Sequence, residues 1–166
     1  MLDREHRNYA EKVLKHLFIG TQVDGMQFGI SPATIKIYFT NFDMSCGSDD
    51  YGGQLYLNIE SKWCLFDNPP ETYPSNEDQI EDYSEDEQYS RIFKVRRQKV
   101  VNVKLGEETP HLFITLENGY TIFVNGSHDE YECWQAGVQF DNDTWLVVSA
   151  PNDEISAWAP VGFNTK

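Results

Sequence analysis

One β-rich sequence unit occurs twice in this chain, and the repeat restricts the folds available to it. Val23 and Val100 each stand six residues before a glycine, Gly29 and Gly106. Six residues after each glycine an apolar alternation begins, and the two alternations run in step, Ile35 with Leu112, Ile37 with Ile114, and Phe39 with Leu116. Alternation is typical of half-buried strands, but it does not fix the spacing of glycines. The pattern therefore predicts a duplicated structural unit.

The ends of the two units also match. Gly52 and Gly119 each precede an asparagine, Asn58 and Asn125, by six residues, so residues 55–57 align with residues 122–124. Each unit is followed by a tryptophan beside a cysteine, Trp63-Cys64 and Cys133-Trp134. Two copies are too few for a solenoid. Two antiparallel β-meanders can instead bury their apolar faces against each other or join in one sheet.

The remaining pattern predicts a mostly β, α+β fold. Tyr9, Val13, Leu14 and Leu17 lie at helical spacing, with Gly20 as a stop signal. Asn118-Gly119, between two apolar runs, predicts a hairpin. We expect a single domain over residues 1–166, made of an N-terminal helix (1–18), a first β unit (19–66), an acidic loop (67–90), a second β unit (91–136), and a C-terminal hairpin and tail (137–166).

Residues 67–90 are the least regular part of the sequence, with three prolines, nine acidic residues and no basic residue. Residues 76–88 fit either a helix with Ile80 and Tyr83 on one face or a solvated loop. The charge inverts immediately afterwards, in a basic cluster formed by Arg91, Lys94, Arg96, Arg97 and Lys99. This cluster either neutralises the acidic loop or contacts a partner.

The formal net charge of −14 bears on the choice of partner. So negative a surface repels nucleic-acid phosphates and anionic membranes and favours basic proteins. Acidity can also serve solubility alone. The three cysteines, Cys46, Cys64 and Cys133, form no CxxC pair, and neither a signal-peptide pattern nor a membrane span is visible. We therefore expect a cytoplasmic protein without disulfides.

The sequence contains little that indicates catalysis. No phosphate-binding glycine motif occurs. His128, Asp129 and Cys133 match no common metal-site spacing, and Cys64 and Cys133 lie in strand-like, apolar surroundings. We expect no catalytic residues, no metal and no cofactor. If the chain is an enzyme or binds a small ligand, the first residues to test are His111, His128 and Glu132.

The second unit resembles a group of known domains. It carries Val100 to Val103, then His111 to Gly119 with its Asn-Gly turn, Ile122 to Gly126, and Glu132-Cys133-Trp134. This pattern is similar to small bacterial β-rich domains found beside polymorphic and contact-dependent toxins, where they act as immunity proteins. The resemblance implies inhibition of a cognate toxin by tight binding, without catalysis. It carries over no functional residue, because immunity interfaces differ between partners.

The leading hypothesis is therefore an immunity protein, not an enzyme, that binds a basic toxin domain. Its expected contact residues come from the acidic loop: Asp78, Glu81, Asp82, Tyr83, Glu85, Asp86 and Glu87. One alternative is a phage or plasmid anti-defence protein that mimics nucleic acid, for which regular rows of carboxylates are expected. The others are a small-ligand-binding β domain and a subunit of a larger assembly.

Overall fold

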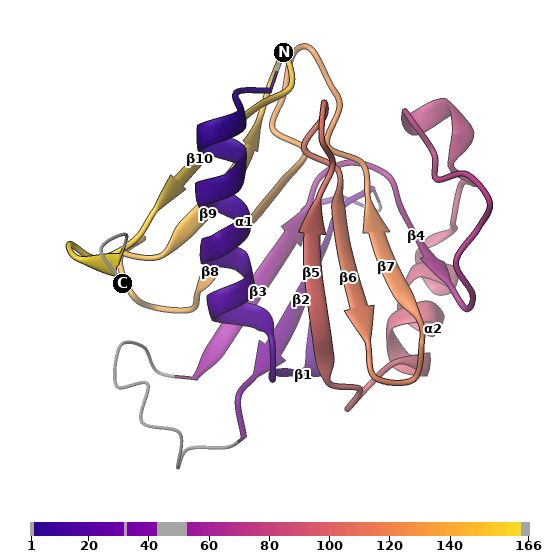
Figure 1. Cartoon of the computed structure of the whole chain (residues 1–166). Helices are drawn as coiled ribbons and strands as arrows, with labels where there is room; N and C mark the ends of the chain where they lie inside the picture. Colours follow the sequence, from indigo (N-terminus) through magenta and orange to yellow (C-terminus); the bar gives the residue numbers. More distant parts are fainter. Residues whose placement is uncertain (1, 32, 43–52, 164–166) are drawn as a thin grey trace.

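The computed structural model describes residues 2–31, 33–42 and 53–163. It is mostly β, with two antiparallel sheets and an N-terminal helix across one open side (Figure 1). The helices are α1 (Arg4–Phe18) and α2 (Glu85–Lys94), with a short 3₁₀ turn, η2 (Glu77–Gln79). The strands are β1 (Gln22–Phe28), β2 (Ile35–Thr40), β3 (Gln54–Ile59), β4 (Trp63–Phe66), β5 (Val100–Leu105), β6 (Leu112–Leu116), β7 (Thr121–Val124), β8 (Trp134–Val138), β9 (Leu146–Ala150) and β10 (Glu154–Trp158).

The two predicted meanders are present, and each gives its next strand to the opposite sheet. β1, β2 and β3 form one meander, and β5, β6 and β7 form the other. β4 then leaves the first unit to pair with β7, whereas β8 leaves the second unit to pair with β3. The larger sheet has the order β1-β2-β3-β8-β9-β10 and the smaller has β4-β7-β6-β5. The predicted C-terminal hairpin, β9–β10, extends the larger sheet.

The first hairpins of the two units share one register. Phe28 lies opposite Ile35 in the first unit, and Leu105 lies opposite Leu112 in the second. Both hairpins shift register at the same place, after Val23 and after Val100. A β-bulge is a specific local feature, so its occurrence at equivalent positions strengthens the case for two copies of one structural unit.

The correspondence includes the segments that enter the two hairpins. The Gly20 N–H donates to the carbonyl of Val100 at 2.9 Å. The equivalent bond from the other unit runs from the Arg97 N–H to the carbonyl of Val23, at 2.7 Å. Gly20 and Arg97 both have positive φ, 94° and 70°. The helix-to-strand turn is therefore repeated along with the strands.

One part of the expected alignment needs correction. In the observed pairing Ile37 faces Leu57, and Ile114 faces Ile122, so Leu57 corresponds to Ile122 and not to Val124. The shift is two residues, which leaves the buried face unchanged because side chains alternate along a strand. Gly52 and Cys46 lie outside the described residues.

The crossing tryptophans occupy equivalent places. Trp63 begins β4 and faces Val124, and Trp134 begins β8 and faces Ile59. Both side chains are buried. The Trp63 indole N–H donates to the Gln88 side chain at 3.2 Å, whereas that of Trp134 donates to the carbonyl of Pro110 at 3.0 Å. These residues hold each crossing strand in the core, which combines the inner faces of both sheets with α1.

The two helices differ in length and in their first turns. α1 has 15 residues and its N-cap is Asp3, whose carboxylate accepts the His6 N–H. α2 has 10 residues and begins with a capping box, in which Ser84 and Glu87 bond each other's backbone N–H. Neither a helix nor a loop therefore spans the whole of residues 76–88, because the cap at Ser84 fixes the start of α2 at Glu85. In the described part of the chain, no helix is long and apolar enough to cross a membrane.

Candidate protein-binding surface

The acidic segment, residues 67–90, runs along the outer face of the smaller sheet. Ile80 is buried there in a small cluster with Cys64 of β4 and Phe123 of β7. The Tyr73 ring makes an edge contact with Phe113 at 4.8 Å between ring centres and stacks near Phe123 at 5.8 Å. These apolar contacts fasten a charge-rich segment that has few apolar residues of its own.

Tyr83 is the third attachment point. Its ring meets Trp63 edge-on at 5.5 Å, and its hydroxyl accepts the Leu65 N–H at 3.4 Å. The Arg91 guanidinium lies 4.6 Å from the Tyr83 ring centre. Of the seven residues expected to contact a partner, Tyr83 is thus half-buried and packs mainly against this chain. Glu87 is also partly buried, and its carboxylate accepts the Ser84 N–H in the capping box.

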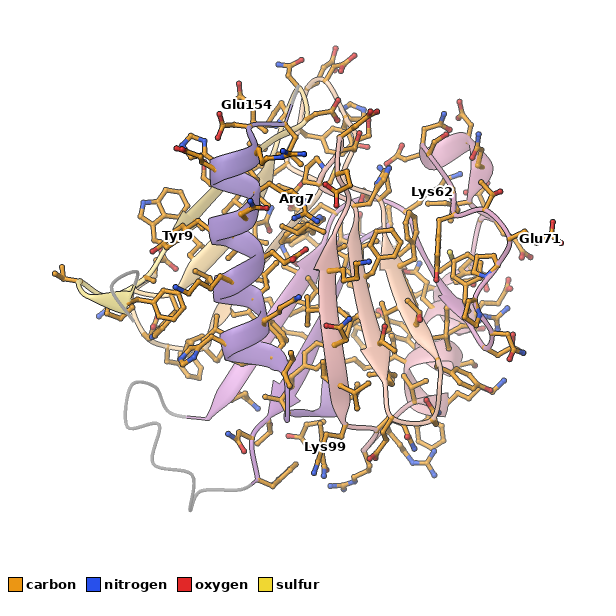
Figure 2. The ribbon with its side chains drawn as sticks, viewed as in Figure 1. Arg7, Tyr9, Lys62, Glu71, Lys99 and Glu154 are labelled. Carbon is orange, nitrogen blue, oxygen red and sulfur yellow. The ribbon has the colours of Figure 1, made fainter. Side chains whose placement is uncertain are left out.

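The other five expected residues are exposed carboxylates: Asp78, Glu81, Asp82, Glu85 and Asp86. Lys62 forms an ion pair with Asp82 at 2.7 Å, and the Asp82 side chain is 85% exposed. Hydrogen bonding to Asp82 raises the pKa of Lys62. Figure 2 shows Lys62 on the same side of the molecule as the acidic segment.

Among the described residues, the side chains of the basic cluster form no ion pairs with the acidic segment. Lys94 lies 5.4 Å from the Tyr120 ring centre, and Arg96 lies 4.0 Å from that of Phe93. Hydrogen bonding to Tyr83 raises the pKa of Arg91, and the negative charges of Glu87 and Glu81 add to the rise. Among ion pairs of the described residues, only Lys62–Asp82 joins a basic side chain to the acidic segment.

A second acidic element, distant in sequence, enlarges this surface. Residues 76–78 and 127–130 line an open hollow of about 440 Å³, which places Glu77 and Asp78 beside Asp129 and Glu130. The Tyr131 hydroxyl donates to Glu77 at 3.0 Å, and burial together with this bond raises the pKa of Tyr131 to about 12. We call the combined set the acidic surface: Glu77, Asp78, Glu81, Asp82, Glu85, Asp86, Asp129 and Glu130. Sequence patterns missed the contribution of Asp129 and Glu130, because the neighbourhood depends on the fold.

The three residues named for a catalytic or ligand-binding role have separate hydrogen-bond partners. His111 is buried; its Nδ1 accepts the Gly126 N–H at 3.0 Å, and its Nε2 lies 3.1 Å from the carbonyl of Ser75. His128 accepts the Glu130 N–H and stacks on Tyr131. Glu132 accepts a bond from Gln135 at 2.9 Å.

The thiols are also placed as packing groups. Burial raises the pKa of Cys64 and of Cys133 to about 12, so neither forms a thiolate near neutral pH. Cys133 Sγ lies 3.9 Å from the side-chain nitrogen of Asn125. Within the described ranges, no three His, Cys, Asp or Glu side chains are grouped to hold a metal ion. His128, Asp129 and Cys133 do not form such a group.

Comparisons of the chain with protein-family models, with curated proteins and with solved structures find no match.

Proposed function

We propose that this protein is a non-catalytic inhibitor of the immunity type, which neutralises a cognate basic toxin by binding it directly in the cytoplasm. The observation that supports the proposal most is the acidic surface. Its carboxylates, of which only Glu77 is half-buried, are concentrated on one anchored segment and the adjoining turn. Among the described residues, Lys62 forms the one ion pair to this surface.

The anchoring supports a role in tight binding. A disordered acidic tail loses conformational entropy when it binds, and this loss weakens the complex. Here Tyr73, Ile80 and Tyr83 already fix the segment on the sheet, so its carboxylates are held in place before a partner arrives. A preorganised negative surface also accelerates encounter with a basic protein.

The proposal is tested by co-expression with the toxic product of the neighbouring gene. The native protein is expected to restore growth and to form a complex whose affinity falls as salt concentration rises. The double variant Asp78→Lys/Glu81→Lys is expected to lose most of the affinity, because like charges now face the basic partner. The matched control is Glu108→Lys/Glu154→Lys, which changes the net charge equally at two exposed positions outside the acidic surface.

Three outcomes would contradict the proposal. They are a neighbouring gene product that is not toxic, a toxin that remains active in the presence of this protein, and an equal loss of affinity in the two double variants. In the last case the effect follows from net charge and not from the acidic surface. Competition with DNA for a defence nuclease would instead favour the anti-defence alternative.

A further inference from the structure

The two hairpins that share a register have edges that differ in what covers them. At the end of β5, the Leu105 N–H donates to the Glu11 carboxylate at 2.9 Å. The carbonyls of Leu105 and Gly106 accept bonds from the Arg7 guanidinium at 2.6 and 3.0 Å. Arg7 and Glu11 also pair with each other at 2.9 Å. Side chains of α1 thus bond the outer backbone groups at the end of β5, as a neighbouring strand would. Figure 2 shows Arg7 between α1 and β5.

The equivalent edge in the first unit lacks this cover. Phe28 takes the place of Leu105 in the shared register, so its N–H and carbonyl also point away from β2. Among the described residues, no hydrogen bond reaches Phe28 from that outer side. Its side chain is 73% exposed, whereas that of Leu105 is 2% exposed.

The cause is the shorter second helix. The helix ends match through Gly20 and Arg97, and counting back from them places Ser84 at the position of Arg7 and Gln88 at that of Glu11. Ser84 is the N-cap of α2, and the Gln88 side chain accepts the Trp63 indole N–H. The first unit therefore has neither side chain that closes β5.

The open edge is bordered by apolar and acidic groups of α2, and by basic groups near the start of β1, where the Arg97 N–H bonds the Val23 carbonyl and Arg96 lies 4.0 Å from the Phe93 ring centre. The Phe28 ring contacts that of Tyr89 at 5.0 Å between centres, and Phe93, one turn further along α2, is 57% exposed. Ile30 follows in the turn and is 98% exposed. Desolvation raises the pKa of Tyr89, and the charge of Glu85, one turn earlier in α2, adds to the rise. Ala33 of the same turn shares a hollow of about 160 Å³ with Glu81 and Asp82.

We propose that the edge of β1 from Gly25 to Phe28 binds an extended, basic segment of a partner protein as an added strand. Main-chain bonds from the segment to Phe28 would correspond to the bonds that Arg7 and Glu11 make to Leu105 in the other unit. Apolar side chains of the segment would cover Phe28 and Phe93. Lysine or arginine on the segment would face Glu85 and the acidic surface. An unpaired strand edge beside apolar side chains is a pairing template. The carboxylates near the Phe28 end, five residues from the Val23 carbonyl that Arg97 bonds, select basic side chains at that end of the added segment.

The test uses a short capped peptide of alternating valine and lysine as the probe, with the full-length protein. Binding is expected in calorimetry, with new amide protection confined to β1. N-methylation of every second peptide amide keeps the charge but removes alternate donors, and is expected to weaken binding about tenfold or more. Phe28→Ala is expected to weaken it about tenfold, and Phe140→Ala, which truncates another exposed phenylalanine, is expected to leave it unchanged.

Several results overturn the inference. These are absence of binding up to millimolar peptide, equal binding of the N-methylated peptide, and equal effects of Phe28→Ala and Phe140→Ala. Sedimentation showing a dimer that Phe28→Ala dissociates would assign the edge to a second copy of this chain, which also overturns it.

The inference rests on the proposed function, because it takes the partner to be basic. The two fail separately. Loss of toxin binding in Asp78→Lys/Glu81→Lys together with a peptide that does not bind would remove the strand-addition site alone. Peptide binding at β1 without protection from any toxin would remove the immunity function alone.

Discussion

The two units of this protein have similar hairpins, but the outer edges of these hairpins have different surroundings. The β5 edge is closed by Arg7 and Glu11 of α1. The β1 edge lies beside a helix five residues shorter and leaves Phe28 exposed. A duplicated scaffold that closes one edge with charged side chains has a ready means of closing the other. Leaving the second edge open is therefore consistent with a binding role.

The largest effect is expected at the crossing tryptophans, which test whether the two exchanged strands contribute equally. Trp63→Ala and Trp134→Ala each remove a buried indole and its hydrogen bond. Each should lower the free energy of unfolding by about 3–5 kcal/mol, measured by urea denaturation. Similar losses would support equivalent crossings. A loss below about 1 kcal/mol at either position would break the comparison, since such a value is typical of surface substitutions.

The closed edge should be more sensitive than its open counterpart. Arg7→Ala removes one ion pair of the Glu11 carboxylate, 17% exposed, which keeps Lys15 at 3.5 Å and the Leu105 N–H. It also removes the hydrogen bonds to the carbonyls of Leu105 and Gly106. We expect a loss of about 2–3 kcal/mol in urea denaturation. Ser84→Ala, at the equivalent place in α2, removes only an N-cap and should lose about 1 kcal/mol.

A matched control for the edge comparison is Arg4→Ala, which truncates an exposed arginine in the first turn of α1 and should change stability by less than about 0.5 kcal/mol. Equal losses for Arg7→Ala and Ser84→Ala would contradict the view that α1 alone closes its edge. They would also weaken the inference drawn for β1.

The sequence predicted the parts of this fold that depend on local spacing. The valine and glycine positions identified the paired hairpins, because Val23 and Phe28 repeat at Val100 and Leu105 with the same bulge. The sequence did not predict that β4 and β8 each pair in the sheet of the other unit. Alternation indicates which face of a strand is buried, but not the sheet in which the strand pairs. The sequence identified the acidic segment but not its neighbours Asp129 and Glu130. Glu77 and Glu130 are some fifty residues apart in the sequence, and only the fold brings them together.

The glycines that revealed the repeat should make similar but smaller contributions than the tryptophans. A methyl group on Gly29 would lie 2.5 Å from the carbonyl oxygen of Thr34, and one on Gly106 would lie 2.3 Å from that of Thr109. Gly29→Ala and Gly106→Ala should each lower stability by about 1–3 kcal/mol, because backbone atoms must shift. Gly25→Ala meets only ordinary contact with Tyr38 and serves as the control in the same urea titrations. Losses for the two hairpin glycines no larger than that of the control would show that the repeat has no steric basis.

The smallest effect concerns a brace that one unit has and the other lacks. His111 ends the β5–β6 turn and links Ser75 of the acidic segment to Gly126. Among the described residues, the hydrogen bonds of the equivalent Thr34 side chain are to Ser31 of its own turn. Because Nδ1 accepts the Gly126 N–H, the folded protein requires the neutral ring with its proton on Nε2. Burial lowers the pKa of His111, opposed by the bond to Ser75 and the charge of Asp153.

A folded-state pKa below the unfolded value means that the unfolded chain binds the proton more readily. The stabilisation is thus fully present above the unfolded pKa of about 6.5 and is lost as pH falls through the folded one. Urea denaturation between neutral and mildly acidic pH should show a steeper decline for the native chain than for His111→Asn, with His128→Asn as the matched histidine substitution for comparison. Hydrogen exchange should show the acidic segment loosening before either sheet, because His111 is one of the groups, with Phe113 and Phe123, that hold this segment on the second unit. A native slope retained in His111→Asn would assign the pH dependence to other groups and leave the two hairpin turns equivalent in this respect.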